Sequence, residues 1–418
     1  MGHSRRSVLA GLALLGLPAG SACSDGEPAP GATDTRVEVF SWWAGPGEKE
    51  GLEALVADFR RQYPGVDFDN AAVAGGAGTV ARSVLATRLQ NDDPPDSYQI
   101  HAGQELAADI AAGYVEDLRY LYDQQGWRAK LPAGLVEAIT FDGAIYSVPV
   151  NIHRSNLLWY RPETLAGLGL TPPATWAEFL AQADGLRSRN LTPLSIGPLW
   201  TQKHLLENVL LGALGPDGYT GLWNGGTDWG GGQVQQALHL FTDVLTLTDA
   251  ATAVGDWQAA VDHVVAGTAV YNLMGDWVDA YLRTKGLTFT TGYGAVASPG
   301  SSRVYNFLSD SFTLPKGAPH RPAAEKWLVT CGSVSGQDAF NPQKGSVPAR
   351  TDADSSKYTG YLAAAMAEWA DEGTRVVGSM THGVVVDNTW STEIDTALSQ
   401  FTQDKDAARF AAAAGRRR

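Results

Sequence analysis

The side chains best suited to chemistry in this chain are its histidines and serines, and their spacing argues against two common kinds of enzyme. Zinc enzymes often use two His four residues apart on a helix, and none of the 8 His has a neighbour at that spacing. The string Gly332-Ser333-Val334-Ser335-Gly336 carries Val where a hydrolase elbow needs its nucleophile. We therefore expect no catalytic residue and no bound metal.

A glycine-rich turn is the next candidate for chemistry. Gly76-Ala77-Gly78-Thr79-Val80-Ala81 follows a predicted strand and opens a predicted helix, as a dinucleotide-binding loop does. It follows the second strand rather than the first, and no acidic residue ends a strand about 20 residues later. The sequence favours a tight turn here and no cofactor, although amides at such a helix start could donate to the hydroxyls of a neutral ligand.

The 13 Trp, beside only 4 Met, indicate a different kind of site. Indole is a large, rigid surface with one donor, and it suits the apolar faces of sugar rings. The chain also carries 31 basic and 45 acidic side chains, for a net charge of -14. This charge would repel phosphate groups, so we exclude DNA, RNA and direct adsorption to anionic lipid as partners.

Residues 1–22 have the pattern of a secretion signal. Arg5 and Arg6 precede an apolar run from Val8 to Leu17, which is too short to span a bilayer. The string Ser4-Arg5-Arg6-Ser7-Val8-Leu9 is close to the twin-arginine export pattern, with Val8 in place of the usual aromatic residue. Sec and Tat export therefore both stay open.

A lipid anchor is expected directly after this signal. Gly20-Ser21-Ala22-Cys23 looks like a bacterial lipobox, in which the cysteine is acylated and becomes the new N-terminus. Ordinary cleavage nearby, giving a free secreted protein, is the alternative. The second cysteine, Cys331, is then a lone buried thiol. Residues 23–35 are rich in Asp, Gly, Pro and Ala, so we expect a lipidated tether on the outer face of the cytoplasmic membrane.

The folded part begins with alternating strands and helices. Leu52, Leu55, Val56 and Phe59 recur at the spacing of one helix face, and Tyr63-Pro64 ends that helix. This order of elements predicts a parallel sheet with helices on both faces. The predicted strands are 37–43, 66–73 and 96–100, and the second predicted helix is 79–89.

Long extended runs later in the chain look like crossings between two lobes. Residues 144–160 are too many for one ordinary strand, and 307–314 and 344–350 are further extended runs. Between them, Thr175 and Glu178 have the spacing of a capping box and predict a helix start.

Six short strings, in one order along the chain, carry a family resemblance. They are Phe40-Ser41-Trp42-Trp43-Ala44-Gly45, Pro94-Pro95-Asp96 leading to Gln99-Ile100-His101-Ala102-Gly103, Ser147 to Asn156, Met274-Gly275-Asp276-Trp277, Leu308-Ser309-Asp310-Ser311-Phe312, and Phe340 to Arg350. In these strings the chain resembles the extracellular sugar-binding proteins of bacterial ABC transporters (solute-binding protein family 1), most closely the glucose/galactose-binding branch. The resemblance runs from about Val37 to the last helix.

The resemblance implies an α/β, two-lobed fold of the periplasmic-binding-protein class II type, with a hinge of crossing segments and a ligand cleft between the lobes. The lobes would be residues 36–147 plus 311–345 at the N-terminal side and 148–310 plus 346–418 at the C-terminal side. It also implies a monomer that binds a monosaccharide without catalysis and docks on membrane permease subunits. The residues that match the branch's ligand contacts are Trp42, Trp43, Glu48, Gln99, His101, Trp257, Trp277, Asp310, Lys344 and His382.

Two departures from the branch affect this expectation. The loop Gly45-Pro46-Gly47-Glu48 is one residue longer than in close relatives, which puts the position of the Glu48 carboxylate in doubt. Ala86 stands where relatives often have a Lys that faces the cleft, so Arg82 or Arg88 could supply that hydrogen bond.

The residue types suit a pyranose, which has apolar C–H faces and a rim of hydroxyls. Indoles would cover the faces, carboxylates would accept from hydroxyls, and Lys344 would donate. Each residue also has a structural interpretation. Adjacent Trp42 and Trp43 on a strand would point to opposite faces, the helical Trp could be core, Asp310 and Lys344 could form a structural ion pair, and the His could be satisfied core residues. His153-Arg154 and Trp200 are weaker candidates for hinge or rim groups.

The sequence leaves three functions open. The first is a receptor for glucose, or for galactose or mannose, that closes on its ligand and delivers it to the permease. The second is an oligosaccharide receptor of the same fold with a longer groove. The third is an exported glycoside hydrolase with Glu48 and Asp310 as acid and nucleophile. We disfavour the third because Lys344 nearby would keep both carboxylates ionised and spoil the acid.

Overall fold

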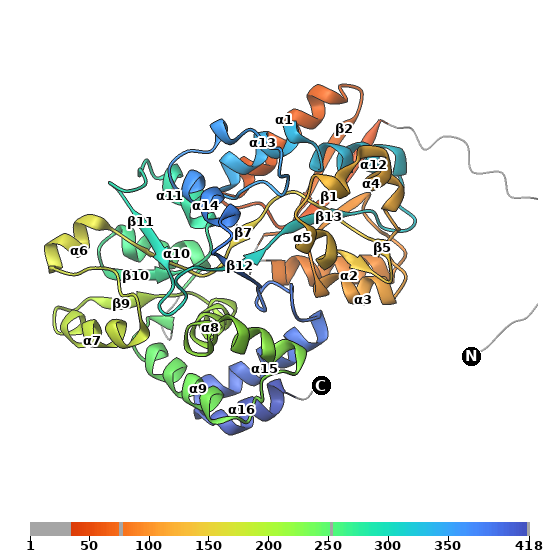
Figure 1. Ribbon diagram of the computed structural model, residues 1–418. Coiled ribbons are helices and arrows are strands. Elements are labelled where there is room, and N and C mark those ends of the chain that lie inside the picture. The colour runs from red at the N-terminus through yellow and green to blue at the C-terminus, as the bar shows by residue number, and fades with distance from the viewer. Residues whose placement is uncertain (1–34, 75–77, 251–253, 416–418) are drawn as a thin grey trace, which may run out of the picture. The chain divides into compact units, whose positions relative to one another are not determined.

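The computed structural model describes residues 35–74, 78–250 and 254–415 of the chain (Figure 1). The predicted signal, the lipidation residue Cys23 and nearly all of the tether lie outside these residues, as does part of the glycine-rich turn (75–77). Within the described ranges, no helix combines the length and apolar composition that a bilayer crossing needs.

A five-stranded sheet forms the core of one lobe, in the order β2-β1-β3-β13-β6 (Figure 1). The first three strands of the chain are parallel, as predicted, and β13 joins β3 antiparallel. The chain therefore returns to this sheet after building the other lobe. The strands are β1 (Arg36–Ser41), β2 (Asp67–Ala72), β3 (Ser97–His101), β6 (Val148–Pro149) and β13 (Asp310–Thr313).

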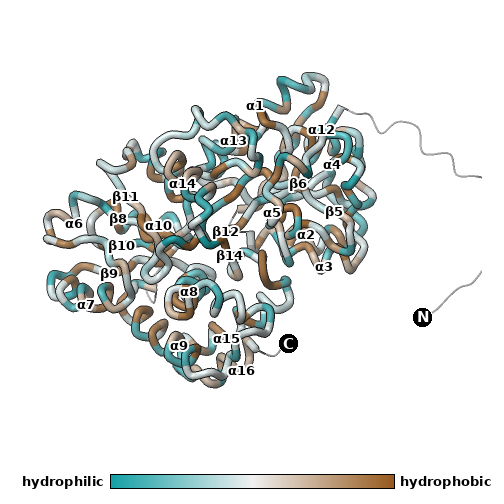
Figure 2. The backbone as a smooth tube through the Cα atoms, in the orientation of Figure 1, coloured by the Kyte–Doolittle hydropathy of each residue, from teal (hydrophilic) through white to brown (hydrophobic). Residues whose placement is uncertain are grey.

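Three helices cover one face of this sheet. Helix α12 (Arg321–Cys331) packs on β1, β13 and β6, while α1 (Lys49–Gln62) packs on α12 and α13 (Val334–Lys344). The predicted apolar face of α1 is buried, with Leu55 and Phe59 fully covered. Figure 2 shows brown, apolar segments interleaved with teal ones along the helices, as helices with one buried face require.

The other lobe is built on two smaller sheets. One has the order β11-β8-β10-β9 and the other the order β14-β12-β7. Helices α8, α9, α15 and α16 pack on one another beside them. The strands are β7 (His153–Arg154), β8 (Leu157–Tyr160), β9 (Thr192–Ser195), β10 (Ala269–Leu273), β11 (Gly294–Ala297), β12 (Val304–Leu308) and β14 (Arg375–Gly378).

Two predicted extended runs do pass between these sheets. Residues 144–160 form four short strands, β5 to β8, and each belongs to a different sheet. Only Ser309 separates β12 of the three-stranded sheet from β13 of the five-stranded sheet. The third expected run starts later than predicted, because Lys344 is the last residue of helix α13 and Gly345, with φ of 77°, ends that helix.

The remaining elements complete both lobes. The predicted capping box is confirmed at α7. The Thr175 side chain accepts from the backbone N–H of Glu178, and the Glu178 side chain accepts from the backbone N–H of Thr175. These elements are α2 (Thr79–Gln90), α3 (Ala107–Ala111), α4 (Arg119–Gln125), α5 (Ala133–Ala138), β4 (Thr140–Phe141), β5 (Ala144–Ile145), α6 (Pro162–Leu168), α7 (Trp176–Arg187), α8 (Leu199–Asn224), α9 (Gly232–Leu245), α10 (Trp257–Val265), α11 (Trp277–Thr284), α14 (Tyr361–Ala370), α15 (Asn388–Asp404) and α16 (Ala407–Ala414).

Candidate functional site

One cavity of about 220 Å³ brings together nine of the ten predicted ligand contacts. Its walls come from both lobes: from the loop after β1, the end of β3, the start of β13 and the end of α13 on one side, and from α8, α10, α11 and the segment after β14 on the other. It is lined by Trp42, Trp43, Gly45, Glu48, Ala74, Gly78, His101, His153, Trp200, Asp256, Trp257, Gln258, Trp277, Leu308, Asp310, Lys344 and His382.

Asp310 is the centre of the polar wall and is only 3% exposed. Its Oδ1 accepts from Gln99 Nε2 at 2.9 Å and its Oδ2 from Asn151 Nδ2 at 2.7 Å. Burial alone would favour the neutral acid, but the positive charge of Lys344, the neighbouring histidines and the hydrogen bond from Asn151 together outweigh it and lower the pKa of Asp310. A buried carboxylate that is ionised and held by two amides is a fixed acceptor for ligand hydroxyls.

Gln99 is the predicted contact that does not line the cavity. It lies behind Asp310, to which its amide nitrogen donates, and its Oε1 accepts from the backbone N–H of Trp42 at 3.2 Å. Gln99 therefore holds two lining residues in place rather than forming part of the wall.

Lys344 continues the polar wall through a hydrogen-bonded chain. Its Nζ lies 3.1 Å from His153 Nε2, while His153 Nδ1 bonds the carboxylate of Asp276. A lysine ammonium only donates, so His153 accepts on Nε2 and donates from Nδ1 to Asp276. Burial lowers the pKa of His153 well below its usual value, in agreement with this neutral form.

His101 is oriented in the same way by an acid. Its Nδ1 lies 2.6 Å from Glu105 Oε2, which turns Nε2 towards Asp310 Oδ1 at 3.7 Å. Arg82 forms an ion pair with Glu105, with 3.4 Å between Nη1 and Oε1, and Arg88 forms one with Glu38, with 2.6 Å between Nη1 and Oε1. Neither arginine lines the cavity, so the expectation that one of them replaces the Lys missing at Ala86 receives no support.

Glu48 reaches the cavity despite its longer loop. It directly precedes α1 and is partly buried. Burial raises the pKa of this carboxyl to about 7, with Lys344 opposing the rise. The expectation that Lys344 keeps both acids ionised is therefore wrong for Glu48, because the loss of hydration on burial outweighs the attraction of this carboxylate to the ammonium.

Tryptophans make up most of the opposite wall. The ring of Trp277 lies 6.5 Å from that of Trp257 and 5.4 Å from His382, both at steep angles. Trp200, nearer the rim, donates from Nε1 to Asp256 Oδ1 at 2.9 Å. These edge-to-face contacts fix the rings before any ligand arrives.

Trp42 and Trp43 follow β1 rather than lying on it. The strand ends at Ser41, so the expected alternation of the two side chains between faces does not apply, and both rings line the cavity. Trp43 also packs against Phe312 and Phe340, so part of its ring is core. Trp42 depends on Gly78, which has φ of 87° and where a Cβ would lie 2.9 Å from the indole.

Sequence reasoning missed several lining residues, of which Asp256 and Gln258 are polar. Asp256 caps helix α10 and directly precedes Trp257. The same Asp-Trp pair opens α11 at Asp276-Trp277, and this repetition was a usable signal. Leu308 and Ala74 carry no chemical signal of their own. His153 and Trp200, named as weaker candidates, both line the cavity.

Comparison with known proteins gives the context of this cavity. A sequence profile of the bacterial extracellular solute-binding protein family matches residues 45–338. An uncharacterized ABC transporter extracellular-binding protein of Pyrococcus horikoshii is 30% identical over 396 residues, which cover 92% of this chain and 89% of that protein. A probable sugar-binding periplasmic protein of Brucella suis is 30% identical and is covered to 83%, as is this chain.

Solved structures with the same fold include receptors for sugars of different lengths. A chitin oligosaccharide binding protein superposes with a TM-score of 0.79 at 17% identity and covers 92% of this chain and 98% of its own. A bacterial solute receptor described as exclusively preferring β-D-galactopyranose superposes with a TM-score of 0.78 at 17% identity and covers 91% and 97%. The two-lobed fold predicted from the sequence is thereby confirmed.

Proposed function

This chain belongs to the bacterial extracellular solute-binding protein family, and on that premise we propose that it binds one monosaccharide in the cavity described above. Glucose is the first choice, with galactose and mannose as alternatives. The receptor releases the sugar unchanged to the permease subunits of an ABC importer.

The observation that carries this proposal is the pairing of polar and aromatic walls around a small volume. Pockets for drug-sized ligands measure about 300–1,000 Å³, and this cavity measures about 220 Å³, which favours one ring over several. Asp310 and Lys344 would bind the hydroxyl rim, and Trp257 and Trp277 the C–H faces. A site that pairs buried polar groups with hydroxyls rejects analogues that lack them.

Delivery follows from the division of the cavity between two lobes. A sugar that contacts Lys344 on one lobe and Trp277 on the other favours the closed form, because it makes both sets of contacts only there. The proposed lobes are residues 36–147 plus 311–345 and 148–310 plus 346–418. We further propose that the protein is a monomer, tethered by acylated Cys23 to the outer face of the cytoplasmic membrane after signal cleavage.

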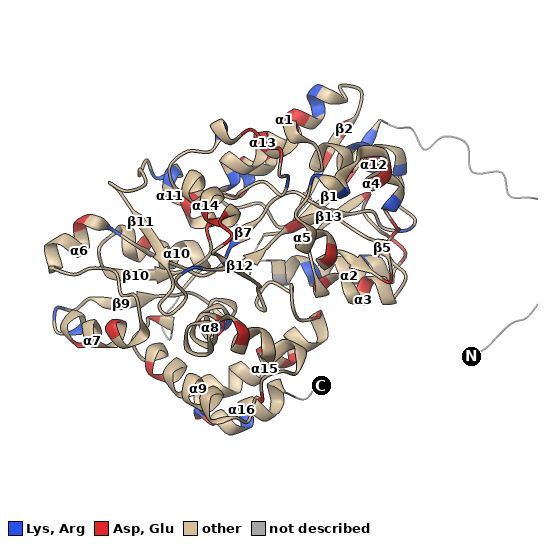
Figure 3. Ribbon diagram, in the orientation of Figure 1, with Lys and Arg blue, Asp and Glu red and all other residues tan. Residues whose placement is uncertain are grey.

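The distribution of charge supports a neutral ligand. In the view of Figure 3, acidic and basic residues lie interspersed over the described part of the chain. The net charge of -14 disfavours a polyanionic partner.

Calorimetric titration tests the proposal directly. Protein from residue 36 onward is titrated with glucose, galactose, mannose and xylose, and Trp fluorescence is followed in parallel. Saturable binding of one or more monosaccharides supports the proposal, and no heat with any of them refutes it.

An oligosaccharide ligand is the second candidate, favoured by the match to a chitin oligosaccharide binding protein. Cellobiose, maltose and chitobiose belong in the same titration. Tighter binding of a disaccharide than of its monosaccharide would replace the first proposal with this one.

Hydrolysis is the third candidate, and the geometry around Asp310 argues against it. Both oxygens of this proposed nucleophile accept from amides, which hold the carboxylate in place and weaken it as a nucleophile. Glu48, with a pKa of about 7, does have the property of an acid catalyst. Release of an aryl leaving group that Glu48→Gln abolishes would establish hydrolysis.

A further inference from the structure

A buried acid outside the cavity, Glu207 on helix α8, organises the segment that carries His382. Glu207 has no exposed surface. It accepts hydrogen bonds on Oε1 from Tyr219 Oη at 2.6 Å, Asn306 Nδ2 at 2.9 Å and the Met380 N–H at 2.6 Å, and on Oε2 from Ser379 Oγ at 3.0 Å and the Thr381 N–H at 3.3 Å. This donor set suits an ionised carboxylate.

Ser379 passes the effect of Glu207 on to His382. A carboxylate can only accept, so the Ser379 hydroxyl gives its single proton to Glu207. The Ser379 oxygen lies 2.9 Å from His382 Nδ1 and can then only accept from it. His382 therefore carries its proton on Nδ1 and leaves a lone pair on Nε2.

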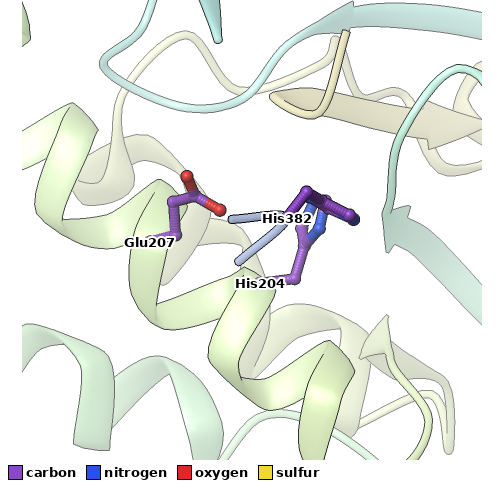
Figure 4. A group of neighbouring side chains, drawn as sticks. All are labelled: His204, Glu207 and His382. Carbon is purple, nitrogen blue, oxygen red and sulfur yellow. The ribbon is translucent and has the colours of Figure 1, made fainter. Parts of the chain in front are cut away.

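The Nε2 atom of His382 is the end of this series of hydrogen bonds and, within the described structure, has no partner of its own. It is buried and has no hydrogen-bond partner among the described residues, and His382 lines the cavity while Glu207 does not. Figure 4 shows one ring nitrogen of His382 turned away from Glu207. Burial, followed by the nearby His101, lowers the pKa of His382 well below its usual value, so the ring is neutral.

A metal ion is the competing interpretation of the same side chains. His204, Glu207 and His382 offer ligand atoms within 4.8 Å of one another (Figure 4), and His204 Nδ1 has no partner in the described structure. A metal would find free lone pairs on His204 Nδ1 and His382 Nε2, but its third ligand, Glu207, is already engaged, because Ser379 joins His382 Nδ1 to this carboxylate and its Oε1 accepts three donors. The hydrogen-bonded chain accounts for more of the contacts.

We propose that Glu207 and Ser379 form a relay that fixes His382 Nε2 as an acceptor, so that the cavity selects a ligand hydroxyl able to donate at that point. Both are positioning residues, since neither lines the cavity. The proposal deepens the proposed function and rests on it in one respect, namely that His382 touches the sugar.

The decisive variant is Glu207→Gln. Three donors meet Oε1, so the new amide oxygen must occupy that place and the NH2 group faces Ser379. The serine oxygen then accepts from the amide and its proton turns to His382 Nδ1. We expect the His382 proton to move from Nδ1 to Nε2, which long-range ¹H–¹⁵N spectra of ¹⁵N-histidine-labelled, ligand-free protein report directly.

Three further variants keep the test interpretable. Ser379→Ala removes the link and leaves Glu207 intact, so it should give a mixture of both His382 tautomers even if Glu207→Gln fails to fold. Glu325→Gln, in a surface helix where Glu325 bonds Tyr120 and Arg321, is the matched control and should leave the His382 signals unchanged. His382→Gln assigns those signals.

Ligand analogues test the consequence for selection. Glucose and its four monodeoxyfluoro analogues are titrated into the wild type and into Glu207→Gln. In each analogue a fluorine, which cannot donate a hydrogen bond, replaces one hydroxyl. The wild type should bind one analogue roughly 10- to 100-fold more weakly than glucose. In Glu207→Gln the difference in affinity between glucose and that analogue should be smaller.

Three results would overturn the relay. The first is a folded Glu207→Gln protein in which His382 keeps its proton on Nδ1. The second is a folded Ser379→Ala protein in which His382 has the wild-type tautomer. The third is a melting temperature of the wild type that ZnCl2 raises and EDTA returns to its original value. A reversed tautomer in a protein that binds no sugar would refute the proposed function alone.

Discussion

The two walls of the cavity differ in how completely the protein has already satisfied them. On the wall at Asp310, three charged or polar side chains have protein partners: two amides for Asp310, His153 for Lys344 and Glu105 for His101. On the wall at Trp277, the rings touch one another edge to face and His382 Nε2 is left open. The first wall is fixed largely by charge, and the second largely by shape, with His382 Nε2 as an unpartnered acceptor.

This difference separates two roles that a binding site must combine. A preorganised ionic wall loses little entropy on binding and contributes strength. An apolar wall tolerates many rings, so discrimination there depends on its polar atoms, among them the unpartnered acceptor His382 Nε2. Changes on the first wall should therefore weaken all ligands, and changes on the second should alter their ranking.

Asp310→Asn should have the largest effect. The amide would present NH2 to the donors of Gln99 or Asn151 and would leave Lys344 without its carboxylate. We expect affinity for the bound monosaccharide to fall at least about 100-fold, roughly 3 kcal/mol, as measured by calorimetry. The control Asp69→Asn removes an exposed pairing with Arg36 and should not change affinity. Equal affinities in both variants would erase the distinction between the walls.

Trp277→Ala should come next and should affect stability as well. Trp277 is 6% exposed and packs against Trp257, His153 and His382. We expect roughly 10- to 100-fold weaker binding, with thermal stability reduced through loss of a buried indole. Trp369→Ala, which removes a partly buried indole next to Tyr305, should lower stability alone. A Trp277 variant that loses stability but keeps its affinity would contradict the role of the aromatic wall.

The titration of Glu48 gives a smaller, pH-dependent effect. Its pKa is about 7 in the folded protein against an ordinary value of 4.5, so folding favours the protonated form. The associated stability is present below about pH 4.5 and is lost as pH rises through 7. The full shift corresponds to roughly 3 kcal/mol, and because Glu48 is partly exposed we expect about 1–2 kcal/mol.

Urea unfolding of ligand-free protein at pH 5 and pH 8 measures this effect. Glu48→Gln cannot titrate, so its stability relative to the wild type should be higher at pH 8 than at pH 5. Parallel pH profiles for the two proteins would show that Glu48 is ionised throughout.

Trp200→Phe should have the smallest effect. It keeps an aromatic ring at the rim, although a smaller one, and removes the Nε1–H that donates to Asp256. We expect less than about a fivefold loss of affinity, roughly 1 kcal/mol. A loss as large as that of Trp277→Ala would extend the aromatic wall to the rim.

Much of the fold could be predicted because its signals are local. The apolar face of α1 and the capping box at Thr175 are set by residues three or four positions apart, and the strings that carry the family resemblance placed nine lining residues. The predictions that failed depend on contacts between residues far apart in the sequence. Gln99 looked like a contact, but its partner Asp310 lies 211 residues away and stands between it and the cavity.

Glu207 shows the same limit more clearly. In the sequence it is one acid on a long helix, and nothing nearby marks it as buried. Its partners Met380 and Ser379 are more than 170 residues away, so only the folded chain reveals that a carboxylate sets the proton of His382.

The single residue between β12 and β13 limits how far the Asp310 carboxylate would travel in the lobe closure that we propose. Atoms near a rotation axis sweep short arcs, and Asp310 directly follows Ser309, where the chain passes from one sheet to another. In the lobe closure that we propose, its carboxylate would therefore keep nearly the same position in the open and closed forms. A sugar would then meet this nearly stationary carboxylate first and would be enclosed afterwards by Trp257 and Trp277.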